Sequence, residues 1–428
     1  MANAFSKEER VAFEDLLEGF HDALVLSRNV GIYNTDQTMM ARTNDTIWRP
    51  MPYIAQSISS TPGSTIAGSY QDMTQLSVPA TIGFSRTVPW TMTTLDLRDA
   101  LQEGRLGEAA KQKLASDINL AIMNAAANLG SLVVDIGAAA GTYDDVALCD
   151  SIMNEQGVAD YDRYLALSSR DYNGLAGNIA GAAAAATRSF GGNKSNTAFE
   201  RSFVGMVAGF ETFKFDYANR LTGAAGGATL IDTQVGAANF FVPAATSTAV
   251  SGETQNVDNR FQTITVDNTG GVAAGDAFTI SGVEAVHHIT KQGTGQPKTF
   301  RVVSVTNATD MVITPPIISA QGGSDAELQY QNCIVTPAAA APLTWLNVNT
   351  AAVNAFWQRD ALELLPGRYA VPTDAGTAVM RATTDQGIEV VMQKFYDIDS
   401  MTIKYRLDTL FGVVNKQPEM SGILLFNQ

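Results

Sequence analysis

The sequence predicts an α+β protein in which a compact all-β unit interrupts a larger host. Short apolar or alternating runs recur between Gly223 and Pro342, and clusters rich in Gly, Pro, Asn and Asp separate them. All four tryptophans fall outside that stretch, two before it and two after, which indicates a host core that spans the gap. Elsewhere, helices and strands occur without the regular strand–helix–strand repeat of α/β proteins, which favours an α+β fold. The strands expected in the inserted unit are 262–266, 277–280, 299–305 and 311–314.

Composition narrows the classes of function. The 428 residues suggest about two to four domains. Only 17% of residues are charged, and 43 acids against 28 bases give a net charge of −15. Because a nucleic-acid groove needs clustered Lys and Arg, which the sequence lacks, tight or sequence-specific DNA binding is not expected. Cys149 and Cys333 are interpreted as reduced, partly buried thiols, with a single bridge as the alternative.

The first element along the chain is an amphipathic helix near the N-terminus. Ser6 and Glu9 form a capping-box pattern. Apolar residues follow on one helical face, and Glu14, Asp15 and Glu18 lie on the opposite face. This acidic face is either a solvated surface or a docking face for a basic partner. The segment has no apolar signal-peptide core, and no run reaches the ~18 apolar residues of a membrane helix, so a cytosolic protein without a membrane partner is expected.

A long two-stranded arm and a spine helix are expected next. The arm extends from Trp48 to Val88, with an exposed loop or hairpin tip at Ser57–Tyr70 and an alternating strand at 76–84. Over Gly107–Leu129 the spacing of apolar residues becomes that of a helix. Gly130 is expected to cap that helix in the left-handed conformation.

The remaining host elements mix both types. A strand is expected at 131–135, helices at 150–157 and 171–187, and helical patterning resumes at Leu343 after the inserted unit. Strand-like runs at 387–395 and 401–407 and a closing strand at 422–426 complete the chain.

The chain offers little chemistry for catalysis. His287 and His288 lie in the inserted unit without a Cys or carboxylate at metal-ligand spacing, so they are interpreted as surface strand residues. The run 191–195 resembles only the tail of a phosphate loop. Asp397 and Asp399 lack a partner base and are interpreted as solvated or salt-bridged acids. No catalytic residue, metal or cofactor is expected.

Several segments resemble, in the same order along the whole chain, the major coat protein of short-tailed bacteriophages. They are Asn44-Asp-Thr-Ile-Trp-Arg-Pro50, the end of the spine helix with the following Gly130–Val134, Val257-Asp-Asn-Arg-Phe261, Gly275–Val283 and Asn354-Ala-Phe-Trp-Gln-Arg-Asp-Ala361.

The resemblance implies the capsid fold shared by tailed phages and herpesviruses, with an inserted β-barrel domain. The domains it implies are an N-terminal arm at 1–45, an extended loop with arm strands at 46–90, a peripheral domain with the spine helix at 91–150, the first part of an axial domain at 151–222, the inserted β-barrel at 223–342, and a return segment of the axial and peripheral domains at 343–428.

The function that the resemblance implies is structural. Copies would assemble around a scaffolding protein into a precursor of an icosahedral shell, in the host bacterial cytoplasm. The shell would then expand as double-stranded DNA is packaged, with a portal at one vertex. Glu14, Asp15 and Glu18 would be candidates to receive a basic scaffold helix. Glu253, Asp258 and Arg260 would be candidates for contacts between capsomers, with an ordinary polar turn as the alternative. A different class, a secreted or surface β-rich adhesin or fibre module that binds carbohydrate, is the runner-up.

Overall fold

The computed structural model describes most of the chain. Contacts between residues divide the chain into two compact units. Unit 1 comprises Met1–Ile47, Pro79–Ala125 and Leu362–Val414, and unit 2 comprises Trp48–Val78, Ala126–Ala361 and Asn415–Gln428. The residues that the structure does not describe are 1–9, 12, 15, 17–23, 34–45, 53–54, 56, 94–99, 183–200, 216–219, 228, 233–240, 371–377, 385 and 428, and only the backbone is described for 100–108 and 178–182.

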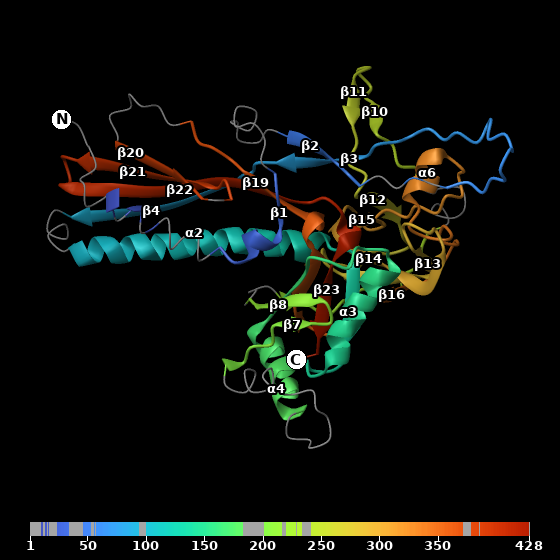
Figure 1. Ribbon diagram of the computed structural model, residues 1–428, viewed down its shortest axis with the longest axis horizontal. Helices are drawn as coiled ribbons and strands as arrows, with labels where there is room; N and C mark the ends of the chain where they lie inside the picture. The colour runs from blue at the N-terminus through green and yellow to red at the C-terminus, as the bar shows by residue number, and fades with distance from the viewer. Residues whose placement is uncertain are drawn as a thin grey trace. The chain divides into compact units, whose positions relative to one another are not determined.

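Unit 1 combines a long helix with a mixed sheet. The helix α2 (Ala100–Leu129) begins seven residues before the predicted start and has 30 residues. Its buried stripe includes Leu114, Ile118 and Ile122, each fully buried. The six-stranded sheet has the order β1-β19-β22-β21-β20, and β4 also pairs with β22. In Figure 1 the axis of α2 is aligned with the long strands of this sheet, which run antiparallel to one another.

The strands of that sheet have the following bounds: β1 Gly31–Ile32, β4 Phe84–Thr93, β19 Leu362–Pro366, β20 Ala378–Thr383, β21 Glu389–Asp397 and β22 Thr402–Asn415. The 3-10 helix η1 (Leu26–Asn29) attaches to α2 because the backbone N–H of Leu26 donates to Asn119 Oδ1 at 3.3 Å. The predicted strand 401–407 is part of one longer strand, β22.

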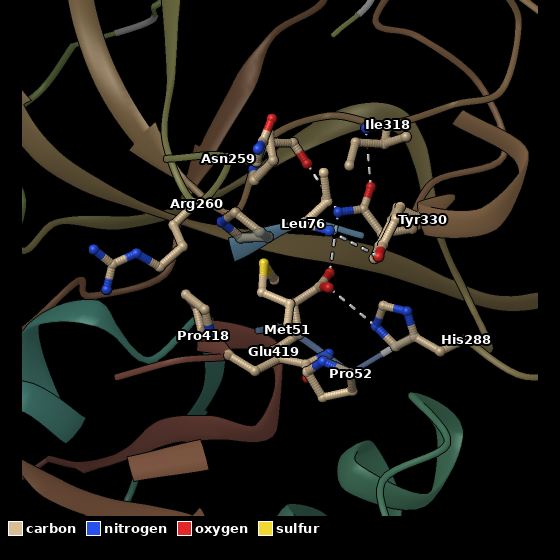
Figure 2. Close-up of a pocket in the computed structure, with 14 residues that line it drawn as sticks. Met51, Pro52, Leu76, Asn259, Arg260, His288, Ile318, Tyr330, Pro418 and Glu419 are labelled. Carbon is tan, nitrogen blue, oxygen red and sulfur yellow. Dashed lines mark hydrogen bonds and ion pairs between the residues drawn. The ribbon is translucent and has the colours of Figure 1, made fainter. Parts of the chain in front are cut away.

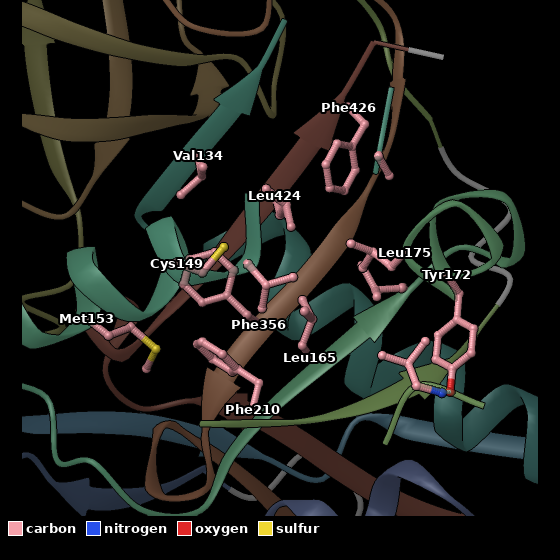
Figure 3. Packing of buried hydrophobic residues seen from close by; sticks show 14 of the residues in the cluster. Val134, Cys149, Met153, Leu165, Tyr172, Leu175, Phe210, Phe356, Leu424 and Phe426 are labelled. Carbon is pink, nitrogen blue, oxygen red and sulfur yellow. Dashed lines mark hydrogen bonds between the residues drawn. The ribbon is translucent and has the colours of Figure 1, made fainter. Parts of the chain in front are cut away.

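Unit 2 contains a second six-stranded sheet, in the order β5-β23-β18-β6-β8-β7. Its strands are β5 Leu132–Ile136, β6 Arg163–Leu167, β7 Met206–Val207, β8 Phe210–Lys214, β18 Asn354–Gln358 and β23 Ser421–Phe426. Helices α3 (Tyr143–Glu155) and α4 (Ser169–Ala182) contribute Cys149, Met153, Tyr172 and Leu175 to the core of this sheet, as Figure 3 shows.

The inserted unit forms a five-stranded antiparallel sheet in unit 2, in the order β12-β15-β14-β13-β16. The strands are β12 Gln262–Thr265, β13 Ala277–Val286, β14 Gly293–Val305, β15 Asp310–Thr314 and β16 Leu343–Trp345. The four predicted runs therefore do form strands. Closure of this sheet into a barrel stays a prediction.

Three sequence expectations for this region were wrong. The inserted unit is not all-β, because it contains the helix α6 (Asp325–Tyr330), capped by Ser324. Trp345 is not a host residue, because its ring packs on Phe278 of the inserted unit at a centroid distance of 5.5 Å. Helical patterning does not resume at Leu343: the described residues that follow form strands, including β17 (Ala351–Ala352), and the short 3-10 turns η4 (Arg359–Ala361) and η5 (Pro418–Met420).

Gly130 ends α2 for a reason other than the predicted one. It does not adopt the left-handed backbone expected of a cap. A Cβ atom there would lie 2.6 Å from the carbonyl oxygen of Ala126 and 2.9 Å from the nitrogen of Gly422. Glycine is thus needed because the helix end and strand β23 approach each other closely.

The arm strands and the hairpin of unit 2 complete the fold. Strands β2 (Thr46–Pro50) and β3 (Ser77–Thr81) pair with each other, and the predicted alternation holds, since Leu76, Val78 and Ala80 are buried. Short strands β10 (Thr246–Thr248) and β11 (Thr254–Asn256) form a separate hairpin, and β9 (Arg220–Leu221) pairs with β17.

Candidate functional site

The hairpin β10–β11 carries one of the residues predicted to lie between capsomers. Every residue of both strands is exposed, and Glu253 lies next to β11 with its side chain in solvent. At the turn, Val250 is fully exposed and Gly252 has the left-handed φ of 86° that a tight turn requires. Among the described residues, β10 and β11 form a two-stranded sheet of their own, with no third strand paired to them.

The other two predicted residues are engaged within the subunit. Arg260 Nη2 donates to Asp258 Oδ2 at 2.6 Å, and Arg260 Nη1 donates to the carbonyl oxygen of Asn415 at 2.8 Å. The Arg260 side chain is only 8% exposed. Asp258 Oδ1 also accepts from the backbone N–H of Arg260, which forms a polar turn. The structure therefore separates exposed Glu253 from the internal Asp258–Arg260 pair.

The long loop of the arm is exposed as predicted. Every described residue from Ser57 to Met73 is exposed to solvent. Among them are four large apolar side chains: Ile58, Ile66, Tyr70 and Met73 are 47%, 40%, 81% and 66% exposed.

The N-terminal acidic face is described only in part. Glu14 is helical and exposed, and its neighbours Phe13 and Leu16 are buried, as the amphipathic pattern predicts. Asp15 and Glu18 lie outside the described residues.

A buried group of charged residues, which the sequence did not indicate, ties the inserted unit to the C-terminal segment. Glu419, in η5, lies at the centre of this group and lines a pocket together with His288 and Pro418, as Figure 2 shows. Glu419 Oε1 accepts from Lys298 Nζ at 2.5 Å, and Glu419 Oε2 lies 3.1 Å from His288 Nε2. Lys298 is 1% exposed.

Neutral side chains complete the hydrogen bonding of this group. Lys298 Nζ also donates to Gln156 Oε1 at 2.9 Å, from the end of α3, and Asn332 Nδ2 donates to Glu419 Oε1 at 3.1 Å. The group therefore joins α3, strand β14, the segment after α6 and the C-terminal segment. A buried ion pair needs such additional bonds, because the attraction alone does not offset desolvation of two charges.

The ionisation of this group follows from its surroundings. Burial by itself would raise the pKa of the Glu419 carboxyl, but the charges of His288 and Lys298 and their hydrogen bonds hold that pKa well below its usual range. Lys291 lies nearby, and its Nζ donates to the carbonyl oxygens of Gln329 and Gln331 at 2.7 and 3.2 Å. Burial lowers the pKa of Lys291 to about 8, while the attraction of Glu419 acts in the opposite direction.

The other candidate side chains have structural roles. The thiols of Cys149 and Cys333 are free and buried, so the alternative of a single bridge was wrong. His287 Nδ1 accepts from the backbone N–H of Ile289 at 3.3 Å and organises a turn. Asp397 accepts from Lys404 Nζ at 2.9 Å, and this hydrogen bond lowers the pKa of its carboxyl. The phosphate-loop-like run 191–195 lies outside the described residues.

In the part of the chain that the structure describes, no group of three or more His, Cys, Asp or Glu side chains could hold a metal ion. No helix among the same residues is both long and apolar enough to cross a membrane.

The long exposed arm, the projecting hairpin and the mixed sheets are typical of a structural protein that works through contacts. The family model described as "P22 coat protein - gene protein 5" matches residues 1–427. The chain belongs to this family of phage coat proteins. It is therefore a structural protein of the icosahedral capsid shell of a bacteriophage, with the α+β fold of tailed-phage capsids. The adhesin alternative is not supported.

The chain is also similar to several solved structures. The chain is 34% identical to "CUS-3 coat protein I-domain", covering 29% of this chain and 98% of that one, with a TM-score of 0.22. It is 10% identical to "Capsid structure of the Cyanophage P-SCSP1u" (95% and 88% covered, TM-score 0.46) and 10% identical to "Mycobacterium phage Che8" (94% and 91% covered, TM-score 0.45). The assignment to the family rests on the match over residues 1–427.

Proposed function

We propose that this coat protein assembles with a scaffolding protein into a precursor shell, in the cytoplasm of the host bacterium, and that the shell expands as double-stranded DNA is packaged. One vertex holds a portal. The subunit acts by contact with other copies, without catalysis or a cofactor. The net charge of −15 favours a lining that holds DNA without sequence-specific binding, because phosphates neutralised by Lys or Arg would add affinity.

The observation that carries the proposal is the exposed apolar surface of the arm loop at 57–73. Tyr70 and Met73 are 81% and 66% exposed on a loop that returns to the body of unit 2 at residues 72–76. Burying such side chains against a second copy would contribute about 25 cal/mol per Å² of apolar surface removed from water. Many identical copies provide such a surface by symmetry.

The direct test is electron microscopy of the expressed chain, with and without a basic scaffolding protein. Closed shells that form only with the scaffold, and that enlarge on heating or DNA packaging, are expected. A chain that stays monomeric with the scaffold present would contradict the proposal.

The acidic N-terminal helix is the proposed docking face for the scaffold. We expect that Glu14→Ala combined with Glu18→Ala slows scaffold-assisted assembly at low salt, because two attractive charges are removed. The difference from wild type should shrink at high salt, since the Debye length falls from about 10 Å at 0.1 M to about 3 Å at 1 M. Light scattering during assembly measures both effects.

A matched control removes the same charge elsewhere. Glu155→Ala with Glu211→Ala changes the net charge equally but leaves the N-terminal helix intact, and we expect wild-type assembly. If the two double variants assemble at the same rate at every salt concentration, the docking face is wrong.

The hairpin β10–β11 is the proposed contact between capsomers. We expect Glu253→Lys to give fragile shells or tubes while the subunit keeps its fold. Because Glu253 is exposed, reversing its charge changes only the surface that a neighbouring subunit would contact. Glu211→Lys, at an exposed position of β8, is the control. Reversal at Asp258 is less informative because it also breaks the internal pair with Arg260. Intact, stable shells from Glu253→Lys would count against the contact.

A further inference from the structure

Three side chains of the short helix α6 bind the backbone of the segment 72–76, where the arm loop returns to the body of unit 2. Gln329 Nε2 donates to the carbonyl oxygen of Asp72 at 2.6 Å, and Gln329 Oε1 accepts from the N–H of Thr74 at 3.2 Å. Tyr330 Oη donates to the carbonyl oxygen of Thr74 at 2.9 Å and accepts from the N–H of Leu76 at 3.4 Å. Asp325 Oδ2 accepts from the N–H of Asp72 at 2.7 Å.

The bonded groups are those that one edge of a β-strand presents. In an extended chain, alternate residues direct their N–H and C=O groups to the same side. Residues 72, 74 and 76 form such a set, yet the segment 72–76 belongs to no strand. Side chains from α6 thus take the place of a neighbouring strand. Since the bonds are to backbone groups, they depend little on which side chains the segment carries.

Part of this contact is buried. Gln329 is fully buried, and Tyr330 is 8% exposed. Leu76, which is 1% exposed, packs in a small core with Ile318 and Tyr330. Figure 2 shows Leu76 beside Tyr330 and Ile318. One residue later, Ser77 forms an isolated parallel bridge with Asp258. The backbone of the returning end is therefore held from Asp72 to Ser77, although the side chains of residues 57–73 are exposed.

We propose that α6 is a backbone clamp: Asp325, Gln329 and Tyr330 hold the returning end of the arm loop and so set the direction in which the exposed loop leaves the subunit towards a second copy. These are positioning residues for shell assembly, and this role rests on the proposed function. Clamping also explains why the inserted unit contains a helix at this place in an otherwise β-rich segment.

The first test measures amide hydrogen exchange on the full chain before assembly. In the wild type, the N–H groups of Thr74 and Leu76 should be protected, although they lie in no sheet. Gln329→Leu should speed exchange at Thr74 by about tenfold, since a net hydrogen bond contributes about 0.5–1.5 kcal/mol and about 1.4 kcal/mol is tenfold. Tyr330→Phe should do the same at Leu76. Tyr70→Phe, which removes an exposed hydroxyl from the same loop, should change neither rate.

A second pair of variants tests whether the contact is made to the backbone. Thr74→Pro removes the N–H that Gln329 accepts, and should impair closed-shell assembly and leave the loop end unprotected. Met73→Pro removes an N–H on the opposite edge of the same extended segment, so protection of Thr74 and Leu76 should stay near wild type. This variant controls protection only, because the Met73 side chain belongs to the exposed apolar surface proposed for assembly. Circular dichroism and thermal melting establish that each variant has folded.

The outcomes test the clamp, its positioning role and the proposed function separately. Equal exchange at Thr74 in wild type and Gln329→Leu would overturn the clamp. A lost clamp with unchanged shell yield and shape would overturn the positioning role. A wild-type chain that never forms shells would overturn the proposed function and the positioning role with it, while protection of the amides would still establish the clamp itself.

Discussion

Replacing Lys298 with methionine is expected to lower the free energy of unfolding by about 3–5 kcal/mol, because it leaves the Glu419 carboxylate buried without its closest positive partner. Methionine retains most of the buried side-chain volume, so the lost packing is small. Urea denaturation, monitored by tryptophan fluorescence, measures the change. The shift should appear in the midpoint at an unchanged slope if only the native state is affected.

Two further variants identify the cause. Lys404→Met breaks an ion pair of similar length, between Lys404 Nζ and Asp397 Oδ2 at 2.9 Å, at a position where Lys404 is 52% exposed, and a much smaller shift is expected. The double variant Lys298→Met with Glu419→Leu removes both buried charges and should recover much of the loss. A double variant as unstable as the sum of the single ones would show that the charges are not the reason.

The pH dependence of stability provides an independent check. The pKa of Glu419 is lower in the folded chain than the value of about 4.5 of an unfolded glutamate. Its contribution to the free energy of unfolding is therefore complete at neutral pH. It is lost progressively as pH falls below about 4.5 towards the folded pKa. Lys298→Met should therefore flatten the fall in stability on the acid side of pH 4.5, whereas Lys404→Met should leave that part of the profile closer to wild type.

The sequence did not indicate this group because its members are far apart along the chain. Lys298 and Glu419 are separated by 121 positions, and Lys298 and Gln156 by 142. Single charged residues in strand-like segments are usually solvent-facing, and nothing local distinguishes Lys298 from an exposed lysine. Only the approach of the inserted unit to the C-terminal segment makes the pairing possible.

Local sequence patterns predicted helices and strands correctly where one face of the element is buried. The alternation at Leu76, Val78 and Ala80 and the stripe along α2 were predicted because burial imposes a period of two or of 3.6 residues. The helix α6 was missed although it carries a local signal. Ser324 and Glu327 form a capping box, in which the N–H of Glu327 donates to Ser324 Oγ at 3.2 Å and the N–H of Ser324 donates to Glu327 Oε2 at 3.1 Å. The clamp residues could have been placed on a helix from that signal, but their partners at 72–76 could not.

Replacing Gly422 with alanine is expected to destabilise unit 2 by about 3 kcal/mol or more, at the upper end of the cost of overfilling a core. Gly422 lies in β23 between two neighbouring strands, opposite Leu132 of β5 and Phe356 of β18. A Cβ there would lie 2.3 Å from the carbonyl oxygen of Leu132 and 2.5 Å from the Phe356 ring. The Leu132 contact is with backbone, which cannot rotate away as a side chain could.

The control for Gly422 is Gly137→Ala, just after β5, where a Cβ would meet nothing within 4 Å and the backbone is not left-handed. That variant should stay within about 0.5 kcal/mol of wild type, as surface substitutions usually do. The contrast separates crowding from the general effect of replacing glycine, which restricts the unfolded chain equally in both variants. Because the crowded sheet also receives the end of α2 at Gly130, the damage in Gly422→Ala should extend to amide protection in β5 and β18. Loss of protection confined to β23 itself would mean that the three strands do not share one packed core.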